Sequence, residues 1–370
     1  MNHFLYESFC NSKNFDHFEQ ELDKLEDAIS NDTNVLLYSK RRYGKVSLIK
    51  EFIEKRIDHE KFIPIYVDLF NISSAIDFTK LMYKTIASSI HCDNNLILRE
   101  LKLIFTKANF TAIMNENGQL EFDVSLVSYD PEELIADIYK GLKKINLNTK
   151  KQMLLIFNDF WQVKSIKTPK IDLILKTYIQ DEEYIKYIFT GSKYHMLLEM
   201  FTKRKMPLYN LAIPQELKAI PIDQFYEFIK VKSNDKITYE IFEHIYEKSD
   251  GEPKLVQEFC FHLCNLFHEK EEFTLNDVEE VCLFFQKSKS EYFKIILNRL
   301  TMVQKTALKA IILSQGTELY TKANLFKLQI TKASLNTAIK TLLNDELIDK
   351  VENKYIISNK CFELWCKRVL

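Results

Sequence analysis

The chain has 370 residues, of which 46% are hydrophobic and 28% are charged; this balance is typical of folded globular proteins and excludes a disordered chain. The length is sufficient for two or three domains. The formal net charge of −1 hides an asymmetry, because residues 287–370 carry 15 Lys and Arg against 7 Asp and Glu, a balance of +8. A basic C-terminal segment on an acidic chain favours an anionic partner.

Membrane and metal-binding classes find no support in the sequence. No uncharged apolar stretch approaches the roughly 18 residues that span a bilayer, and the first residues, MNHFLYE, do not resemble a signal peptide. We therefore expect a cytoplasmic protein with no membrane partner. The seven cysteines lack metal-ligand spacing, so we expect free thiols and no metal centre. In a helix, Cys260 and Cys264 would share one face while His262 lies opposite.

The N-terminal part predicts a helix followed by a phosphate-binding loop. Apolar residues at helical spacing predict a helix from Phe15 to Ile29. Residues 35–49 then read VLLYSKRRYGKVSLI, which predicts a buried strand, a tight loop and a helix that opens at Gly44-Lys45. This is the layout of the motif G-x-x-x-x-G-K-[ST]. Here Ser39 stands at the first glycine and Val46 at the hydroxyl that binds Mg²⁺, while a hydroxyl follows at Ser47.

The loop keeps the part of a nucleotide site that binds phosphate. Lys45 and the first amides of the helix can still contact phosphate oxygens, whereas Mg²⁺ binding should be weak or absent. An ordinary strand-loop-helix with a basic surface loop fits the same residues. The predicted nucleotide-binding residues of this segment are Ser39, Lys40, Arg41, Arg42, Tyr43, Gly44, Lys45, Val46 and Ser47.

The next elements follow the pattern of a mainly parallel sheet. A β-branched run predicts a second parallel strand at 62–68. Helices are expected at 81–90, 96–105 and 131–145, and a β-hairpin over 110–127 around Asn117-Gly118.

Residues 151–158 predict a buried strand that ends at Asn158-Asp159. This is where P-loop ATPases carry the acids that handle Mg²⁺ and the attacking water. An amide holds a metal-bound water less well than a carboxylate, and Asp159 is one methylene shorter than the usual glutamate. We take Asn158 and Asp159 as the candidate catalytic residues and expect impaired hydrolysis. A buried strand that ends in a polar turn explains them equally well.

The C-terminal part predicts helices and then a winged helix. From Gln215 to His268 the pattern is wholly helical, with Gly251 ending one helix and Pro253 starting the next. Helices at 302–313, 322–328 and 331–344 precede a hairpin of strands 347–351 and 354–357, around Glu352-Asn353. In the third helix, residues spaced by four should share an outer face: Lys332, Asn336 and Lys340. Three roles remain open for this face: contact with a DNA major groove, plain solvation, or docking onto the rest of the chain.

Together these motifs resemble the archaeal-type ATPase group in the STAND branch of AAA+-related P-loop proteins. Members have the sequence F-x-x-R-E-x-E-L before the loop and G-x-R-R-x-G-K-T-S-L across it. In this chain Phe18 stands at the position of the arginine in the first motif. The resemblance covers nearly the whole chain. It implies a sensor at Ser192, or at Thr190, that faces a γ-phosphate, and a nucleotide contact at Pro253 in the G-x-P turn of a lid. A further sensor arginine is replaced at Asn210-Leu211.

The sequence therefore predicts an α/β protein with three domains. These are a three-layer P-loop NTPase domain with a mainly parallel sheet at 1–214, a helical lid at 215–286 and a winged helix at 287–370. We expect a switch that binds ATP or ADP with impaired hydrolysis. Candidate partners are the nucleotide, DNA, and a partner protein or a second copy. The alternative is a nucleotide-independent pseudo-ATPase that serves as a scaffold or DNA-binding adaptor.

Overall fold

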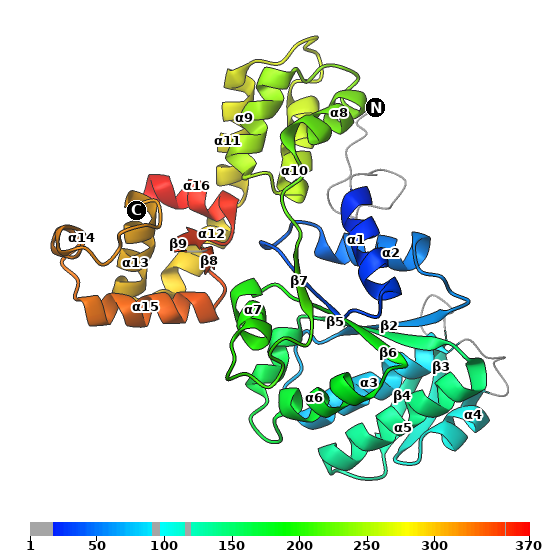
Figure 1. Cartoon of the computed structure of the whole chain (residues 1–370). Coiled ribbons are helices and arrows are strands. Elements are labelled where there is room, and N and C mark those ends of the chain that lie inside the picture. The colour runs from blue at the N-terminus through cyan, green and yellow to red at the C-terminus, as the bar shows by residue number, and fades with distance from the viewer. Residues whose placement is uncertain (1–17, 91–96, 115–119, 352) are drawn as a thin grey trace. The chain divides into compact units, whose positions relative to one another are not determined.

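The computed structural model describes residues 18–90, 97–114, 120–351 and 353–370, and Figure 1 labels their helices and strands. The described residues divide into two compact units. The α/β unit comprises Phe18–Lys40 and Lys45–Leu217; the helical unit comprises Arg41–Gly44 and Lys218–Leu370. The predicted domain boundaries after residues 214 and 286 stay predictions.

The α/β unit contains a five-stranded parallel sheet with the order β2-β5-β6-β1-β7. Two of the three inner strands, β5 and β6, are almost entirely buried and consist mainly of large apolar residues, as expected for parallel strands covered on both faces. This confirms the expected fold class. The strands of the sheet are β1 (Val35–Tyr38), β2 (Phe62–Asp68), β5 (Gln152–Asn158), β6 (Ile185–Thr190) and β7 (Ile213–Glu216).

Strand β7 corrects the prediction that the chain is wholly helical from Gln215 onward. Gln215 and Glu216 pair in parallel with Leu37 and Tyr38 of β1. The strand is only four residues long, IPQE, and it lies at the edge of the sheet. Its proline lacks a backbone N–H donor, which is tolerated in an edge strand. The short run IPQE has no alternating apolar pattern that would predict a strand.

Helices cover both faces of this sheet (Figure 1). Alternate residues of the inner strands enter two separate cores: Val35, Leu37 and Ile188 pack in the core of α1 and α2, while Leu36 and Phe189 pack in the core of the other helices. The first layer contains α1 (Glu19–Ser30) and α2 (Lys45–Lys55). The second contains α3 (Ala75–Ser89), α4 (Ile97–Ile104), α5 (Pro131–Thr149), α6 (Ile171–Asp181), α7 (Tyr194–Thr202) and the 3₁₀ helix η2 (Phe160–Ser165).

The start of α3 differs from the prediction. Helix α3 begins at Ala75, six residues before the expected start at Leu81, because the hydroxyl of Ser74 caps it by accepting from the amide of Asp77. The parts of the predicted helices at Phe15 and Leu96 lie outside the described residues.

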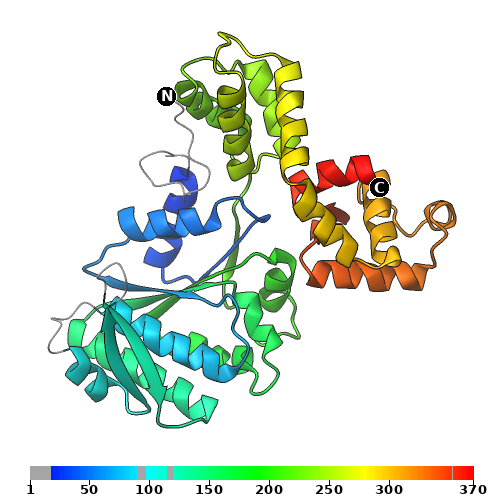
Figure 2. The same cartoon turned by 180° about the vertical axis from the view of Figure 1, so that it is seen from behind.

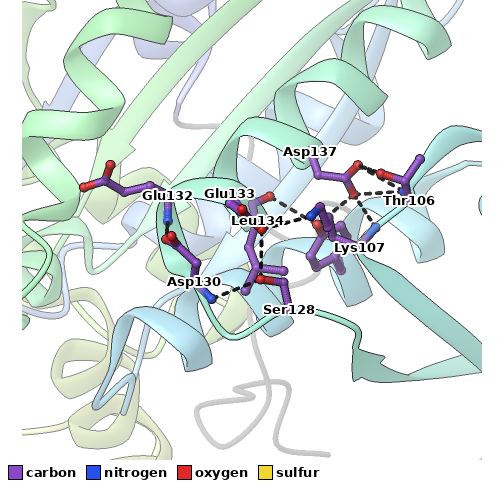
Figure 3. A network of polar contacts seen from close by, with 9 residues as sticks. Thr106, Lys107, Ser128, Asp130, Glu132, Glu133, Leu134 and Asp137 are labelled. Carbon is purple, nitrogen blue, oxygen red and sulfur yellow. Dashed lines mark hydrogen bonds and ion pairs between the residues drawn. The ribbon is translucent and has the colours of Figure 1, made fainter.

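The expected hairpin forms a separate antiparallel pair, β3 (Ala108–Met114) and β4 (Leu120–Leu126); its predicted turn at Asn117-Gly118 lies outside the described residues. Figure 2 shows the pair beside α3. The base of the hairpin is held by Asp137 of α5 (Figure 3). This buried carboxylate accepts from the hydroxyl of Thr106 over 2.7 Å and from the amides of Thr106 and Lys107 over 3.0 and 3.1 Å. This polar network ties the start of the hairpin to α5.

The helical unit has one continuous core that runs from α8 to α16. The first four helices are α8 (Ile222–Lys232), α9 (Tyr239–Ser249), α10 (Pro253–Leu266) and α11 (Leu275–Ser288). Helix α9 ends at Ser249 and is capped by Asp250, which has a left-handed backbone with φ 54°, like Gly251 with φ 64°. The helix stop at Asp250 therefore lies one residue before the predicted stop at Gly251, and Pro253 starts α10 as expected.

The predicted winged-helix elements are present at the C-terminal end. They are α13 (Met302–Leu313), α14 (Lys322–Lys327), α15 (Lys332–Asn344) and the hairpin β8 (Ile348–Val351) with β9 (Lys354–Ile357). Helices α12 (Ser290–Arg299) and α16 (Lys360–Val369) flank them. Of the predicted hairpin turn, Glu352 lies outside the described residues. The buried residues of α15 are Leu335, Ala338, Ile339 and Leu342. Among the described helices, none combines the length and apolarity that crossing a membrane requires.

Candidate nucleotide-binding site

Four strands of the α/β unit end at one edge of the sheet, because all their pairings are parallel. The register places Asp68 opposite Asn158 and Thr190 opposite Leu37, just before the loop that follows β1. Ligands of open α/β sheets bind outside the carboxyl ends of the strands. The polar residues that the sequence singled out along this edge are thus brought together by the sheet topology.

Lys45 is the first residue of α2, and its side chain folds over the start of the loop. Its Nζ donates to Oγ of Ser39 over 2.8 Å and to the carbonyl oxygens of Ser39 and Lys40 over 3.3 Å each. The residue is 8% exposed and Ser39 is 2% exposed. A cation is therefore fixed at the N-terminus of a helix, where the helix dipole also favours an anion.

The backbone of the loop is in the left-handed region at two positions. Gly44 has φ 92° and Arg42 has φ 65°. Glycine adopts this conformation without steric cost, whereas arginine does not. Val46 and Ser47 are half-buried in the first turn of α2, so an aliphatic side chain stands at the position of the usual Mg²⁺-binding hydroxyl.

The tip of the loop, Arg41–Gly44, belongs to the helical unit. The guanidinium of Arg42 lies 3.4 Å from Oε1 of Glu252, at the start of α10. The hydroxyl of Tyr43 donates to the carbonyl oxygen of Asp250 over 2.9 Å, and burial followed by the charge of Asp250 raises the Tyr43 pKa, so this hydroxyl stays protonated. These partners were missed by the sequence analysis, since nothing local links residues so far apart.

Arg41 has an acidic partner too. Its Nη1 lies 2.9 Å from Oε2 of Glu346, in the turn between α15 and β8.

Glu252 is buried, and burial raises its pKa, an effect that Arg42 opposes. Pro253 is buried as the first residue of α10, directly after Glu252.

Asn158 and Asp159 have different surroundings. Nδ2 of Asn158 donates to Oδ1 of Asp68 over 3.1 Å. Asp159 has a left-handed backbone, φ 52°, and its Oδ1 accepts from the amide of Ser192 over 2.8 Å, from its hydroxyl over 2.9 Å and from Nε1 of Trp161 over 3.3 Å. Ser192 and Asp159, predicted for separate roles, are thus bonded to each other, and this carboxylate oxygen is held away from the role of a mobile base.

Thr190 carries a signal that only the structure reveals. Its Oγ1 is buried and finds no hydrogen-bond partner among the described residues. Strand alternation puts Thr190 on the same face as Ile188, which packs in the core of α1 and α2. An unpaired buried hydroxyl costs about 1–3 kcal/mol, and a ligand oxygen at this edge would supply the partner.

These groups fit a polyphosphate better than they fit a hydrated Mg²⁺. Lys45 and Thr190 are donors, as are the first amides of α2. For a cation, the described carboxylates at these strand ends, Asp68 and Asp159, already accept hydrogen bonds, and Val46 has no hydroxyl. Within the described parts of the chain, no group of three or more His, Cys, Asp or Glu is placed to hold a metal ion; the described cysteines, Cys260, Cys264, Cys282, Cys361 and Cys366, are free thiols.

The predicted DNA-contacting residues lie on one exposed face of α15. Lys332, Asn336 and Lys340 are all exposed, whereas Leu335 and Ile339 on the other side are buried. Their assignment to DNA, like that of the loop residues to nucleotide, stays a prediction.

Comparison with known proteins supports the architecture. Residues 291–368 match the family model of a probable winged helix domain, and no curated protein matches the chain. The Walker-type ATPase PABY2304 of Pyrococcus abyssi is similar in structure, with 17% identity and a TM-score of 0.65 over 99% of this chain and 100% of that one. The ORC2 protein of Aeropyrum pernix, solved as ADPNP-ADP complexes, has 15% identity and a TM-score of 0.55, over 98% of this chain and 96% of that one.

A third similar structure is the Aeropyrum pernix ORC1 protein in complex with DNA, with 10% identity and a TM-score of 0.50, over 95% of this chain and 92% of that one. Identities this low establish a shared fold and leave activity open. The parallel sheet with its loop between β1 and α2, together with the matched C-terminal segment, leads to one conclusion: the chain has the fold of an AAA+-like P-loop ATPase that ends in a winged helix.

Proposed function

We propose that this protein is a cytoplasmic nucleotide-binding switch of the STAND type, in which ATP or ADP binds at the loop between β1 and α2 and is hydrolysed poorly or not at all. The placement of Lys45 carries this proposal. Its ammonium is buried at the N-terminus of α2, at the sheet edge where Thr190 Oγ1 has no hydrogen-bond partner within the described parts of the chain. Both groups are donors suited to phosphate oxygens.

Impaired hydrolysis follows from the groups that would handle Mg²⁺ and water. P-loop ATPases hold Mg²⁺ with the loop Ser or Thr and a carboxylate at the end of the neighbouring strand. Here those positions carry Val46 and Asn158, and Oδ1 of Asp159 is occupied by Ser192 and Trp161. Nucleotide binding should therefore depend little on Mg²⁺.

Calorimetry on three proteins tests the proposal: the wild type, Lys45→Ala, and Lys50→Ala as a matched control, since Lys50 is exposed on the same helix. We expect the wild type and Lys50→Ala to bind ATP or ADP with and without Mg²⁺. Lys45→Ala should weaken binding at least about tenfold, because a charge-assisted hydrogen bond is worth roughly 1.5–3 kcal/mol.

Two results would contradict the proposal. No heat from the wild type at millimolar nucleotide would remove nucleotide from the function. Equal affinity of the wild type and Lys45→Ala would place the nucleotide away from this loop.

A second candidate function is a nucleotide-independent scaffold or DNA-binding adaptor. It is favoured by the +8 balance of residues 287–370 and by the exposed face of α15 with Lys332 and Lys340. The structural similarity to a protein solved with DNA points the same way. DNA binding that persists in a protein without nucleotide affinity would favour this function, while DNA binding that changes with nucleotide would favour the switch. A partner protein or self-association remains a further proposal of the same kind.

A further inference from the structure

The tip of the loop carries three consecutive side chains that all bond within the helical unit. Arg41 pairs with Glu346 at 2.9 Å, Arg42 pairs with Glu252 at 3.4 Å, and Tyr43 donates to the carbonyl oxygen of Asp250 at 2.9 Å. The partners come from two separate places, the turn between α9 and α10 and the turn between α15 and β8.

Both arginines have carboxylate partners whose geometry resembles that of phosphate. A guanidinium binds carboxylate and phosphate with the same planar set of donors. The side chains of Arg41 and Arg42 are each 44% exposed, so a phosphate can reach them without rearrangement of the core. Glu252 is different, because its side chain is only 9% exposed. If the Arg42 guanidinium moves away from Glu252, the buried carboxylate loses this ion pair, and the free energy of that arrangement rises.

We propose that Glu252 and Glu346 compete with the phosphates of a bound nucleotide for Arg42 and Arg41, so that phosphate binding detaches the loop tip from these two turns. This inference rests on the proposed function, since it concerns the regulation of the same loop. Coupling of this kind is reciprocal. Nucleotide loosens the turn before α10 and the turn after α15, and removal of either acid strengthens nucleotide binding.

The inference is tested with Glu252→Gln, Glu346→Gln and the double variant, which keep the side-chain shape and remove the charge. We expect ATP and ADP, titrated by calorimetry, to bind about fivefold or more tightly to each variant than to the wild type, the lower range of typical coupling. The matched control is Glu258→Gln in α10, where Glu258 pairs with Lys289 at 2.7 Å and is 12% exposed. It should bind as the wild type does.

Hydrogen exchange on the wild type gives a second readout that needs no substitution. Addition of ATP, or of inorganic tripolyphosphate, should speed the exchange of amides at 250–252 and 344–348. In the double variant these amides should already exchange fast and respond little.

The outcomes separate the two claims. If the wild type binds nucleotide and the variants match Glu258→Gln in affinity and exchange, the competition is overturned while the nucleotide site stands. If only the double variant binds, and Lys45→Ala in that background abolishes binding, the competition is supported. If no protein binds ATP, ADP or tripolyphosphate, both claims fall.

Discussion

Asn158 at the end of β5 donates a hydrogen bond from Nδ2 to Oδ1 of Asp68 at the end of β2, over 3.1 Å. The two residues face each other in the register of the parallel sheet. The amide satisfies the carboxylate without a metal ion. One substitution at Asn158 therefore decides whether this facing pair carries one negative charge or two.

Asn158→Asp should make the stability of the α/β unit dependent on Mg²⁺. Two carboxylates within hydrogen-bond distance repel each other, and one of the two pKa values rises. We expect the variant to lose about 1–3 kcal/mol of unfolding free energy in EDTA and to regain part of it at millimolar Mg²⁺, since paired carboxylates bind this ion. Thermal unfolding with and without Mg²⁺ measures this. Asn158→Ala is the control that should show no Mg²⁺ response, and an equal lack of response in Asn158→Asp would refute the prediction.

Asp137→Ala should strongly destabilise the α/β unit. The carboxylate accepts from two backbone amides, from the hydroxyl of Thr106 and from the hydroxyl of Tyr83, and its loss leaves the part-buried amides of Thr106 and Lys107 without this acceptor. We expect a loss of about 3 kcal/mol. Urea unfolding in a Trp365→Phe background isolates the fluorescence of Trp161, because the chain has two tryptophans.

The exposed Glu132 on the same helix provides the control for this measurement. Glu132→Ala should change the unfolding free energy by less than about 0.5 kcal/mol. An Asp137→Ala protein as stable as Glu132→Ala would show that the hairpin does not need this network.

Asp277 should contribute a pH-dependent part of the stability of the helical unit. Burial alone would raise its pKa, but hydrogen bonds from Lys270 and Thr274 hold the pKa below its ordinary value of 3.8. A lowered pKa means that the contribution is complete above pH 3.8 and is lost as the pH falls through the lowered value. Asp277 also completes the capping box of α11, so Asp277→Asn should cost about 1 kcal/mol near neutral pH.

The difference in unfolding free energy between the wild type and Asp277→Asn, measured from pH 7 to pH 3, reports this contribution alone. It should stay constant down to about pH 4 and then shrink. Glu280→Gln, at an exposed position of the same helix, should show no such trend. A difference that grows toward acid pH would reverse the sign and disprove the assignment.

If α15 contacts DNA, its two lysines should set part of the salt dependence. Lys332→Ala with Lys340→Ala removes two cations from the exposed face. For a mixed-sequence duplex, we expect the slope of log affinity against log salt to become shallower by about two. Lys294→Ala in α12, whose side chain is 55% exposed, is the control with an equal charge change per residue. A slope that is the same in the double variant and the control would favour a solvated or docking face.

Much of the architecture follows from strong local patterns. The runs VLLY and QMLLIFN contain enough consecutive apolar residues to predict the buried strands β1 and β5. The pair Gly44-Lys45 marks the start of α2. Helix α13 was predicted with both ends correct, because Thr301 and Gln304 form a capping box that local sequence specifies. Strand β7 was not predicted, because a four-residue edge strand that pairs with one neighbour can form without an alternating apolar sequence.

The sequence by itself determined which segments become strands and helices. It also located Lys45 at a helix start and Asn158 and Asp159 at a strand end, since these properties depend on near neighbours in the chain. Only the tertiary structure decided the partners of those residues. The order of the strands brings Asn158 to Asp68 and Asp159 to Ser192, and the packing of the helical unit brings Arg42 to Glu252. A charge pair between distant segments leaves no periodic signal in the sequence, because its energy exists only after the chain has folded.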